Sequence, residues 1–116
     1  MLQSSMNRTF VELPPFRRYL DSLLEGVDLL REIQETLLEN PEAGDVIPGT
    51  GGLRKMRHGG KGKGKSGGYR VTYLHRPENE KVYLIVLYAK NEQEDLSADE
   101  KRVLKQLVEA LKREGA

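Results

Sequence analysis

The stretch Lys81 to Lys90, KVYLIVLYAK, is apolar on both faces of an extended chain. This pattern is typical of a strand in the middle of a sheet, because other elements cover both of its faces. Upstream, Tyr69 to His75 is rich in β-branched and aromatic residues, and Pro77 to Glu80 has the composition of a turn. We therefore predict two neighbouring strands joined by a short turn.

A third strand is predicted from Leu53, where the side-chain pattern changes to a period of two. Alternate residues of a strand point to opposite faces of a sheet. One face would carry Leu53, Lys55 and Arg57, and the other Arg54, Met56 and His58.

The remaining elements are one strand and three helices. Phe10 to Leu13 is a short apolar run that ends at Pro14, which suits a strand better than a helix. Gly26 separates the first two helices, and Ser97 to Glu100 is a capping box before the third. The three apolar stripes are Phe16, Tyr19, Leu20, Leu23 and Leu24; Val27, Leu30, Ile33, Leu37 and Leu38; and Val103, Leu104, Leu107, Val108 and Leu111. The predicted fold is an α+β domain in the order β-α-α-β-β-β-α, with a small, mostly antiparallel sheet, two N-terminal helices and a C-terminal helix.

The bulk composition limits the function classes. A chain of 116 residues suits one domain, residues 1–116, in which residues 1–6 are expected to form a flexible extension. The absence of cysteine excludes disulfides, thiolate metal sites and a cysteine nucleophile. No apolar run is long enough to span a membrane, and no signal-type segment is visible, so we expect a cytoplasmic protein.

Positive charge is concentrated in one window, Val46 to Pro77. It has 32 residues, with no Asp or Glu, eight Lys or Arg and nine of the twelve glycines. Because the whole chain carries a net charge of +1 and this window +8, the remaining residues carry −7. A dense positive field on glycine-rich backbone favours a polyanion partner, and nucleic acid is the first hypothesis.

Within the window, Gly59 to Ser66 matches the phosphate-binding pattern G-x-x-x-x-G-K-S. That motif works where glycines lead from a strand into a helix whose N-terminus receives the phosphates. Here the next residues, Gly67 to Tyr73, predict a strand, and no apolar strand ends in a magnesium-binding Asp. We therefore reject nucleotide binding of this kind.

The candidate site is a group of cations brought together by neighbouring strands. Lys55 and Arg57 would share a face with Arg70, and Lys90 could add a fourth cation. Like charges on adjacent strands destabilise a sheet, so their clustering favours a phosphate-binding role over a merely solvated face. The segment Gly59 to Gly68 fits a phosphate-gripping loop, a solvated linker or a basic localisation tract.

The histidines and tyrosines of the predicted strands are further candidates for the same site. His58 and His75 titrate near neutral pH but have no carboxylate near them in the sequence, so a metal site is not expected. The tyrosines of the strands are expected to pack in the sheet rather than stack on bases. Contacts with the predicted nucleic-acid partner are expected from Arg54, His58, Lys61, Lys63, Lys65 and Asn91.

Several segments together resemble the RelE/ParE superfamily of bacterial toxins, and within it the HigB-type branch of RelE-like toxins. The resemblance covers about residues 7 to 112. It rests on Asn7 to Leu13 (NRTFVEL), Asn40 to Lys55 (NPEAGDVIPGTGGLRK), Gly68 to Val71 (GYRV) and Leu87 to Glu92 (LYAKNE).

The resemblance implies a toxin of a type II toxin–antitoxin system that cleaves mRNA on the ribosome. The implied partners are a cognate antitoxin, the 70S ribosome and mRNA, with no metal, cofactor or membrane. By this resemblance, the nucleic-acid contacts expected above are contacts with RNA or the ribosome. Arg70 takes the place of the arginine that stabilises the scissile phosphate, Lys55 and Arg57 match the basic pair on the preceding strand, and Lys90 matches a basic position near the end of the last strand. The chain departs from the RelE pattern at Asn91 and near Ser97, where an arginine and a tyrosine are expected. The assignment of general acid and base is therefore open.

Two alternatives remain at the level of sequence. A ParE-like toxin would inhibit DNA gyrase, although the dense cationic strand pair argues against it. A non-catalytic module would use the same basic patch only to bind RNA or the ribosome.

Overall fold

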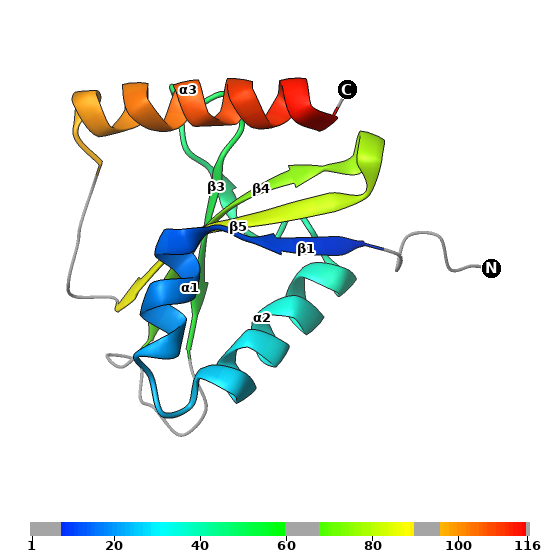
Figure 1. Cartoon of the computed structure of the whole chain (residues 1–116), viewed down its shortest axis with the longest axis vertical. Helices are drawn as coiled ribbons and strands as arrows, with labels where there is room; N and C mark the ends of the chain where they lie inside the picture. Colours follow the sequence, from blue (N-terminus) through cyan, green and yellow to red (C-terminus); the bar gives the residue numbers. More distant parts are fainter. Residues whose placement is uncertain (1–7, 60–67, 90–95, 116) are drawn as a thin grey trace.

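The computed structural model describes residues 8–59, 68–89 and 96–115. Five strands form one sheet in the order β1-β5-β4-β3-β2. Helices α1 and α2 cover one face of this sheet and α3 lies across the other (Figure 1). The elements are β1 (Thr9–Glu12), α1 (Pro14–Asp21), α2 (Gly26–Glu39), β2 (Asp45–Val46), β3 (Arg54–His58), β4 (Tyr69–Arg76), the 3-10 turn η3 (Pro77–Asn79), β5 (Lys81–Ala89) and α3 (Ala98–Gly115).

The strand predicted to be central is indeed enclosed. β5 lies between β1, which is parallel to it, and β4, which is antiparallel. Val82, Leu84 and Leu87 belong to the core under α1 and α2, whereas Tyr83 and Ile85 belong to the core under α3. A register shift opposite Thr72 and Tyr73 leaves β5 with one extra residue. Both faces of β5 are apolar because both are covered by helices.

The predicted α+β class and the mostly antiparallel sheet are confirmed, with two additions to the element order. The two-residue strand β2 pairs with β3, and the turn before β5 is the 3-10 turn η3, which ends at Glu80 with a positive φ of 56°. A two-residue strand is too short to give a periodic signal in the sequence.

The first two helices differ in detail from the predicted stripes. α1 starts at Pro14, whose fixed φ suits the first helical turn, and buries Phe16 and Leu20. Leu24 is fully exposed because α1 ends at Asp21, before that residue. In α2 the buried positions are Leu29, Ile33 and Leu37, and Val27 is 79% exposed. The predicted places of Leu24 and Val27 in the core were therefore wrong.

A tight loop leads from β2 to β3 and determines where β3 begins. The Thr50 hydroxyl, fully buried, donates to the Ile47 carbonyl at 2.6 Å and accepts the Leu53 N–H at 3.2 Å. Gly51 has a positive φ of 80°, and a Cβ at this position would lie 3.3 Å from the Val108 side chain of α3. Lys112 of α3 donates to the Gly51 carbonyl at 3.0 Å. The loop thereby joins β3 to the C-terminal half of α3.

The predicted capping box starts α3. The Ser97 N–H donates to Glu100 Oε1 at 2.9 Å, and the Glu100 N–H donates to Ser97 Oγ at 3.1 Å. Val108 and Leu111 are buried against the sheet, but Val103 is 63% exposed, so its predicted place in the packed stripe was wrong. α3 therefore packs most closely through its C-terminal half.

Some sequence predictions concern residues outside the described ranges. They are the prediction of a flexible extension at residues 1–6 and the predicted site residues Lys61, Lys63, Lys65, Lys90 and Asn91. The rejected phosphate-binding motif also lies largely outside them, but the residues after it, from Tyr69, form β4 and not a helix.

Candidate nucleic-acid interface

Three of the predicted cations lie together on one face of the sheet. In the β3–β4 pair, Arg57 lies directly opposite Arg70, and Lys55 lies opposite Thr72. Opposite residues of adjacent strands project from the same face, so the three cationic side chains share it. Leu53 and Leu74, on the same face further along these strands, pack under α3. The face is thus apolar at one end and cationic at the other.

The cationic end borders an open hollow of about 670 Å³. Lys55, Arg57 and Arg70 line it from the sheet, Asp45 from β2 and Lys101 from the first turns of α3. The C-terminal half of α3 covers the apolar end of this face, which leaves the cationic end accessible. The hollow is therefore a place where a polyanion can reach three strand cations at once.

Electrostatically, these cations are uncompensated within the described part of the chain. No carboxylate there lies within ion-pair distance of Lys55, Arg57 or Arg70. Asp45, although opposite Lys55 in the register, makes no ion pair with it. Arg70 Nε is buried and has no hydrogen-bond partner in the described structure. A buried donor without an acceptor is costly unless a ligand supplies one, and a phosphate oxygen is such an acceptor.

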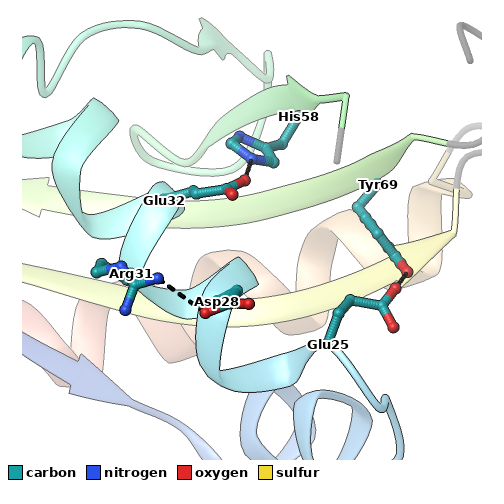
Figure 2. A network of polar contacts seen from close by, with 6 residues as sticks. All are labelled: Glu25, Asp28, Arg31, Glu32, His58 and Tyr69. Carbon is teal, nitrogen blue, oxygen red and sulfur yellow. Dashed lines mark hydrogen bonds and ion pairs between the residues drawn. The ribbon is translucent and has the colours of Figure 1, made fainter. Parts of the chain in front are cut away.

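Arg54 and His58, predicted to contact RNA or the ribosome, lie on the opposite face. Arg54 donates from Nη1 to the Gly44 carbonyl at 2.7 Å. His58 Nε2 lies 3.0 Å from Glu32 Oε1 on α2 (Figure 2). Both side chains therefore have partners within the protein, and the fold does not bring them together with Arg70. Their predicted contacts with RNA or the ribosome stay predictions.

Helix α2 and the residue before it, Glu25, bind the strand ends next to the cations. Figure 2 shows Glu32 directed at His58, the last residue of β3, and Glu25 directed at the hydroxyl of Tyr69, the first residue of β4. His58 and Tyr69 follow Arg57 and precede Arg70 in the sequence. By fixing these two residues from behind the sheet, α2 limits how far the arginines on the front can shift.

A buried tyrosine fixes the chain before β2. The Tyr73 hydroxyl donates to the Pro41 carbonyl at 2.8 Å and accepts the Gly44 N–H at 2.9 Å. Burial raises the pKa of this hydroxyl above its ordinary value, so it remains a donor at physiological pH. A Cβ at Gly44 would lie 2.8 Å from the carbonyl atoms of Lys55, so only glycine allows this close approach to β3.

Two residues of the hollow were not foreseen. Lys101 is distant in sequence from the strands and lies in a helix whose cations look like a solvated face, so no local signal identifies it. Asp45 belongs to a strand of two residues, which also gives no local signal, yet it lines the hollow. Only the packing of α3 and β2 against β3 reveals these neighbours.

Among the described residues, no group of three His, Asp or Glu side chains could hold a metal ion. None of the helices in the described ranges is long and apolar enough to cross a membrane.

The fold and the site define a small α+β protein with helices on both sides of a sheet and a cationic, open end on one face. Comparisons with known proteins give the family. A family model described as the RelE toxin of the RelE/RelB toxin–antitoxin system matches residues 16–114. The chain belongs to this RelE toxin family, and membership implies an antitoxin partner.

A solved structure supports the same fold. The crystal structure of the isolated E. coli RelE toxin matches with a TM-score of 0.52 and 20% sequence identity, over 87% of this chain and 99% of that one. At this identity the likeness establishes the shared fold alone. The closer relation to HigB-type toxins stays a prediction.

Proposed function

We propose that this toxin is a ribosome-dependent mRNA endonuclease, which inhibits translation in the cytoplasm and is held inactive by a cognate antitoxin. The observation that carries the proposal is the direct opposition of Arg57 and Arg70 on an open sheet face, with Lys55 beside them and no carboxylate partner in the described structure. A scissile phosphate placed there supplies the missing anion.

In the proposed reaction, the 2′-oxygen of the RNA attacks the adjacent phosphorus and the bond to the 5′-oxygen breaks. The products are a 2′,3′-cyclic phosphate and a 5′-hydroxyl, so one proton leaves the 2′-oxygen and one reaches the 5′-oxygen. Negative charge grows on the phosphate oxygens in the transition state, where fixed cationic donors stabilise it most.

The roles of the residues follow from their chemistry. Arg70 is the main phosphate clamp, because its planar guanidinium can donate to two oxygens at once and its Nε has no acceptor among the described residues. Arg57, directly opposite, and Lys55 assist at the leaving oxygen or in proton transfer. Lys90 is proposed as the fourth cation of the site, as the family resemblance implies. Ser97, which stands near the place of a RelE tyrosine, has its hydroxyl engaged in the helix cap.

The decisive experiment is primer extension on a message translated by purified ribosomes. Arg70→Ala is expected to reduce cleavage by at least about 100-fold, the effect of removing one strong transition-state donor. Arg70→Lys, which keeps the charge but not the fork, should fall between Ala and the wild type. Arg18→Ala, at an exposed position of α1, is the matched control and should cleave like the wild type.

The outcomes separate the competing functions. Undiminished cleavage by a folded Arg70→Ala variant contradicts the proposed mechanism. Ribosome binding that is sensitive to salt but yields no product selects a non-catalytic binding module. Inhibition of gyrase supercoiling by the wild type, with no cleavage of message, selects a ParE-like toxin.

A further inference from the structure

A second hollow, of about 360 Å³, lies between the sheet and the N-terminal half of α3. Its floor is formed by Thr72, Val86 and Tyr88, and its wall by Val103 and Leu104. We call it the α3 groove. It is mostly apolar, in contrast to the cationic hollow beside it.

The α3 groove exists because the two elements diverge there. The extra residue of β5 places both Ile85 and Val86 toward α3. Ile85 is buried in the core under α3, whereas Val86 lies only partly buried at the floor of the groove. Val103, one turn into the helix, is 63% exposed. Apolar surface thus stays accessible on both sides of the groove.

The groove continues directly from the cationic hollow. Thr72 lies opposite Lys55 and Tyr88 lies opposite Arg70 in the sheet register, and Leu96 lines both hollows. Residues two apart along a strand are about 6.6 Å apart. A ligand whose anionic part rests on Arg70 can therefore place an apolar part in the groove without leaving the sheet face.

The rim of the groove is acidic. Asp99 and Glu100 line it from the first turn of α3. Asp99 pairs with Arg102, while Glu100 holds the cap through Oε1 and has no further partner for Oε2 within the described ranges. A carboxylate accepts hydrogen bonds only, so this rim repels a phosphate but accepts an amino group.

We propose that the α3 groove binds the nucleobase of an RNA nucleotide whose phosphate rests on the cationic face, and that Glu100 selects bases with an exocyclic amino group. Bases combine apolar faces with polar edges, which matches apolar walls under a hydrogen-bonding rim. Adenine, cytosine and guanine offer an amino group and uracil does not. This inference rests on the proposed function, since it assigns a recognition site to the same RNA substrate.

The first test changes the rim without changing the cap. Glu100→Gln keeps an oxygen for the Ser97 N–H but presents an amide donor to the groove. Codon libraries cleaved on ribosomes should show the preference for cytosine over uracil at one codon position fall by at least about fivefold. Glu109→Gln, the same charge change at an exposed position of α3 outside the groove, should leave the preference unchanged. An unchanged preference in Glu100→Gln overturns the role of Glu100.

The second test fills the groove. Val103→Trp should remove base preference at that codon position while the protein remains folded, because Val103 is exposed. Val27→Trp, a change at a similarly exposed residue of α2, is the control. Base preference that survives in a folded Val103→Trp protein overturns the proposal.

A binding measurement separates this inference from the proposed function. In methyl NMR of the wild-type protein, millimolar CMP and AMP should shift the signals of Val86, Val103 and Leu104, UMP should shift them less, and ribose 5-phosphate should leave them in place. Groove signals that respond equally to CMP and UMP, or to none of these probes, overturn the proposal even if message is cleaved. If the groove responds as expected but no message is cleaved, only the nuclease function fails.

Discussion

At the scale of single residues, the pair Arg57 and Arg70 is a feature that folding alone would not favour. Like charges directly opposite one another on adjacent strands destabilise a sheet. Here Arg57 and Arg70 are directly opposite in the strand register, and Lys55 lies two residues before Arg57 on β3. The arginine pair therefore lowers the stability of the fold but produces a strong local positive potential. Residues that serve binding commonly reduce stability in this way.

The first prediction tests both effects. Arg57→Gln should raise the free energy of unfolding by up to about 1 kcal/mol, because it removes the cross-strand repulsion. The same change should lower cleavage of message at least tenfold, since it removes a phosphate donor. Urea unfolding at low and high salt measures the first effect, and the gain should shrink as salt screens the charges. Arg113→Gln is the control for net charge, and a destabilised Arg57→Gln protein would contradict the prediction.

The second prediction concerns His75 on β4. Burial lowers the pKa of this imidazole, and the nearby positive charge of Arg8 lowers it further. Glu42 opposes this shift, and Arg54 and Glu78 have smaller effects that lower and raise the pKa, respectively. Since the folded pKa lies below the unfolded value of about 6.5, the contribution of His75 to stability is complete above that pH. It is lost as the pH falls through the folded pKa, because the unfolded chain then binds the extra proton.

His75→Gln should therefore weaken the loss of stability on acidification below about pH 6.5. Urea unfolding midpoints measured from pH 7.5 downwards for the wild type and the variant provide the comparison. Parallel curves for the two proteins would show that His75 does not contribute.

At the scale of elements, α3 has two functional halves. Its C-terminal half packs on the sheet and on the loop before β3, whereas its first turns stand over the two hollows and contribute Lys101 to one of them. The capping box at Ser97 fixes where these first turns begin. The cap therefore determines the position of the residues that face the proposed RNA.

The third prediction follows from this cap. Ser97→Ala should lower the free energy of unfolding by about 1 kcal/mol, the usual effect of losing an N-cap. The amide protons of the first turn of α3 should exchange faster, while those of β5 should keep their protection relative to global unfolding. Hydrogen exchange measures both regions. If exchange in β5 accelerates as much as in the first turn of α3, by more than the lower global stability explains, the effect is not local and the prediction is contradicted. Ser97→Asp, which can also cap a helix, is the matched rescue variant.

Elements differ in how well the sequence predicts them. β5 is recognisable because a strand covered on both faces is apolar throughout, and the start of α3 is recognisable because a capping box is a local pattern. Leu24, Val27 and Val103 were assigned to cores that they do not join. Periodicity predicts a helix face but not where the helix ends or what it packs against, and that depends on the other elements.

At the scale of the whole molecule, charge is separated along the chain. The acid-free window carries +8 and the rest of the chain −7. The described basic residues of this window have different surroundings. Lys55, Arg57 and Arg70 line the open hollow, Arg54 and His58 bond to groups near or on α2, and Arg76 pairs with Glu78. A long-range field of this kind steers anionic partners toward the open face.

The fourth prediction uses this field. Replacing Lys61, Lys63 and Lys65 together by Gln should weaken binding to ribosomes and make it less sensitive to salt. The slope of log affinity against log salt should fall in magnitude by about 2, because each lost contact with a phosphate of a single strand removes about 0.7. Gln at Arg18, Lys105 and Arg113 gives the same net charge elsewhere and is the control. Equal slopes for the two triple variants would assign the effect to net charge alone.

By itself, the sequence determined the α+β class, the covered central strand, the cap of α3 and the alternation that places Lys55 and Arg57 on one face. These features depend on local periodicity and on residue types, which a single chain displays directly. It also pointed to Arg70, because a cation at the start of the neighbouring strand was expected on the same sheet.

Only the tertiary structure decided that Arg70 lies directly opposite Arg57, that His58 contacts Glu32 on the far face, and that Lys101 lines the hollow. Strand register and the docking of α2 and α3 bring together residues that are distant in the sequence. This register is stabilised by the burial of apolar side chains on both faces of the sheet. That burial depends on elements distant in the sequence, so no local pattern predicts it.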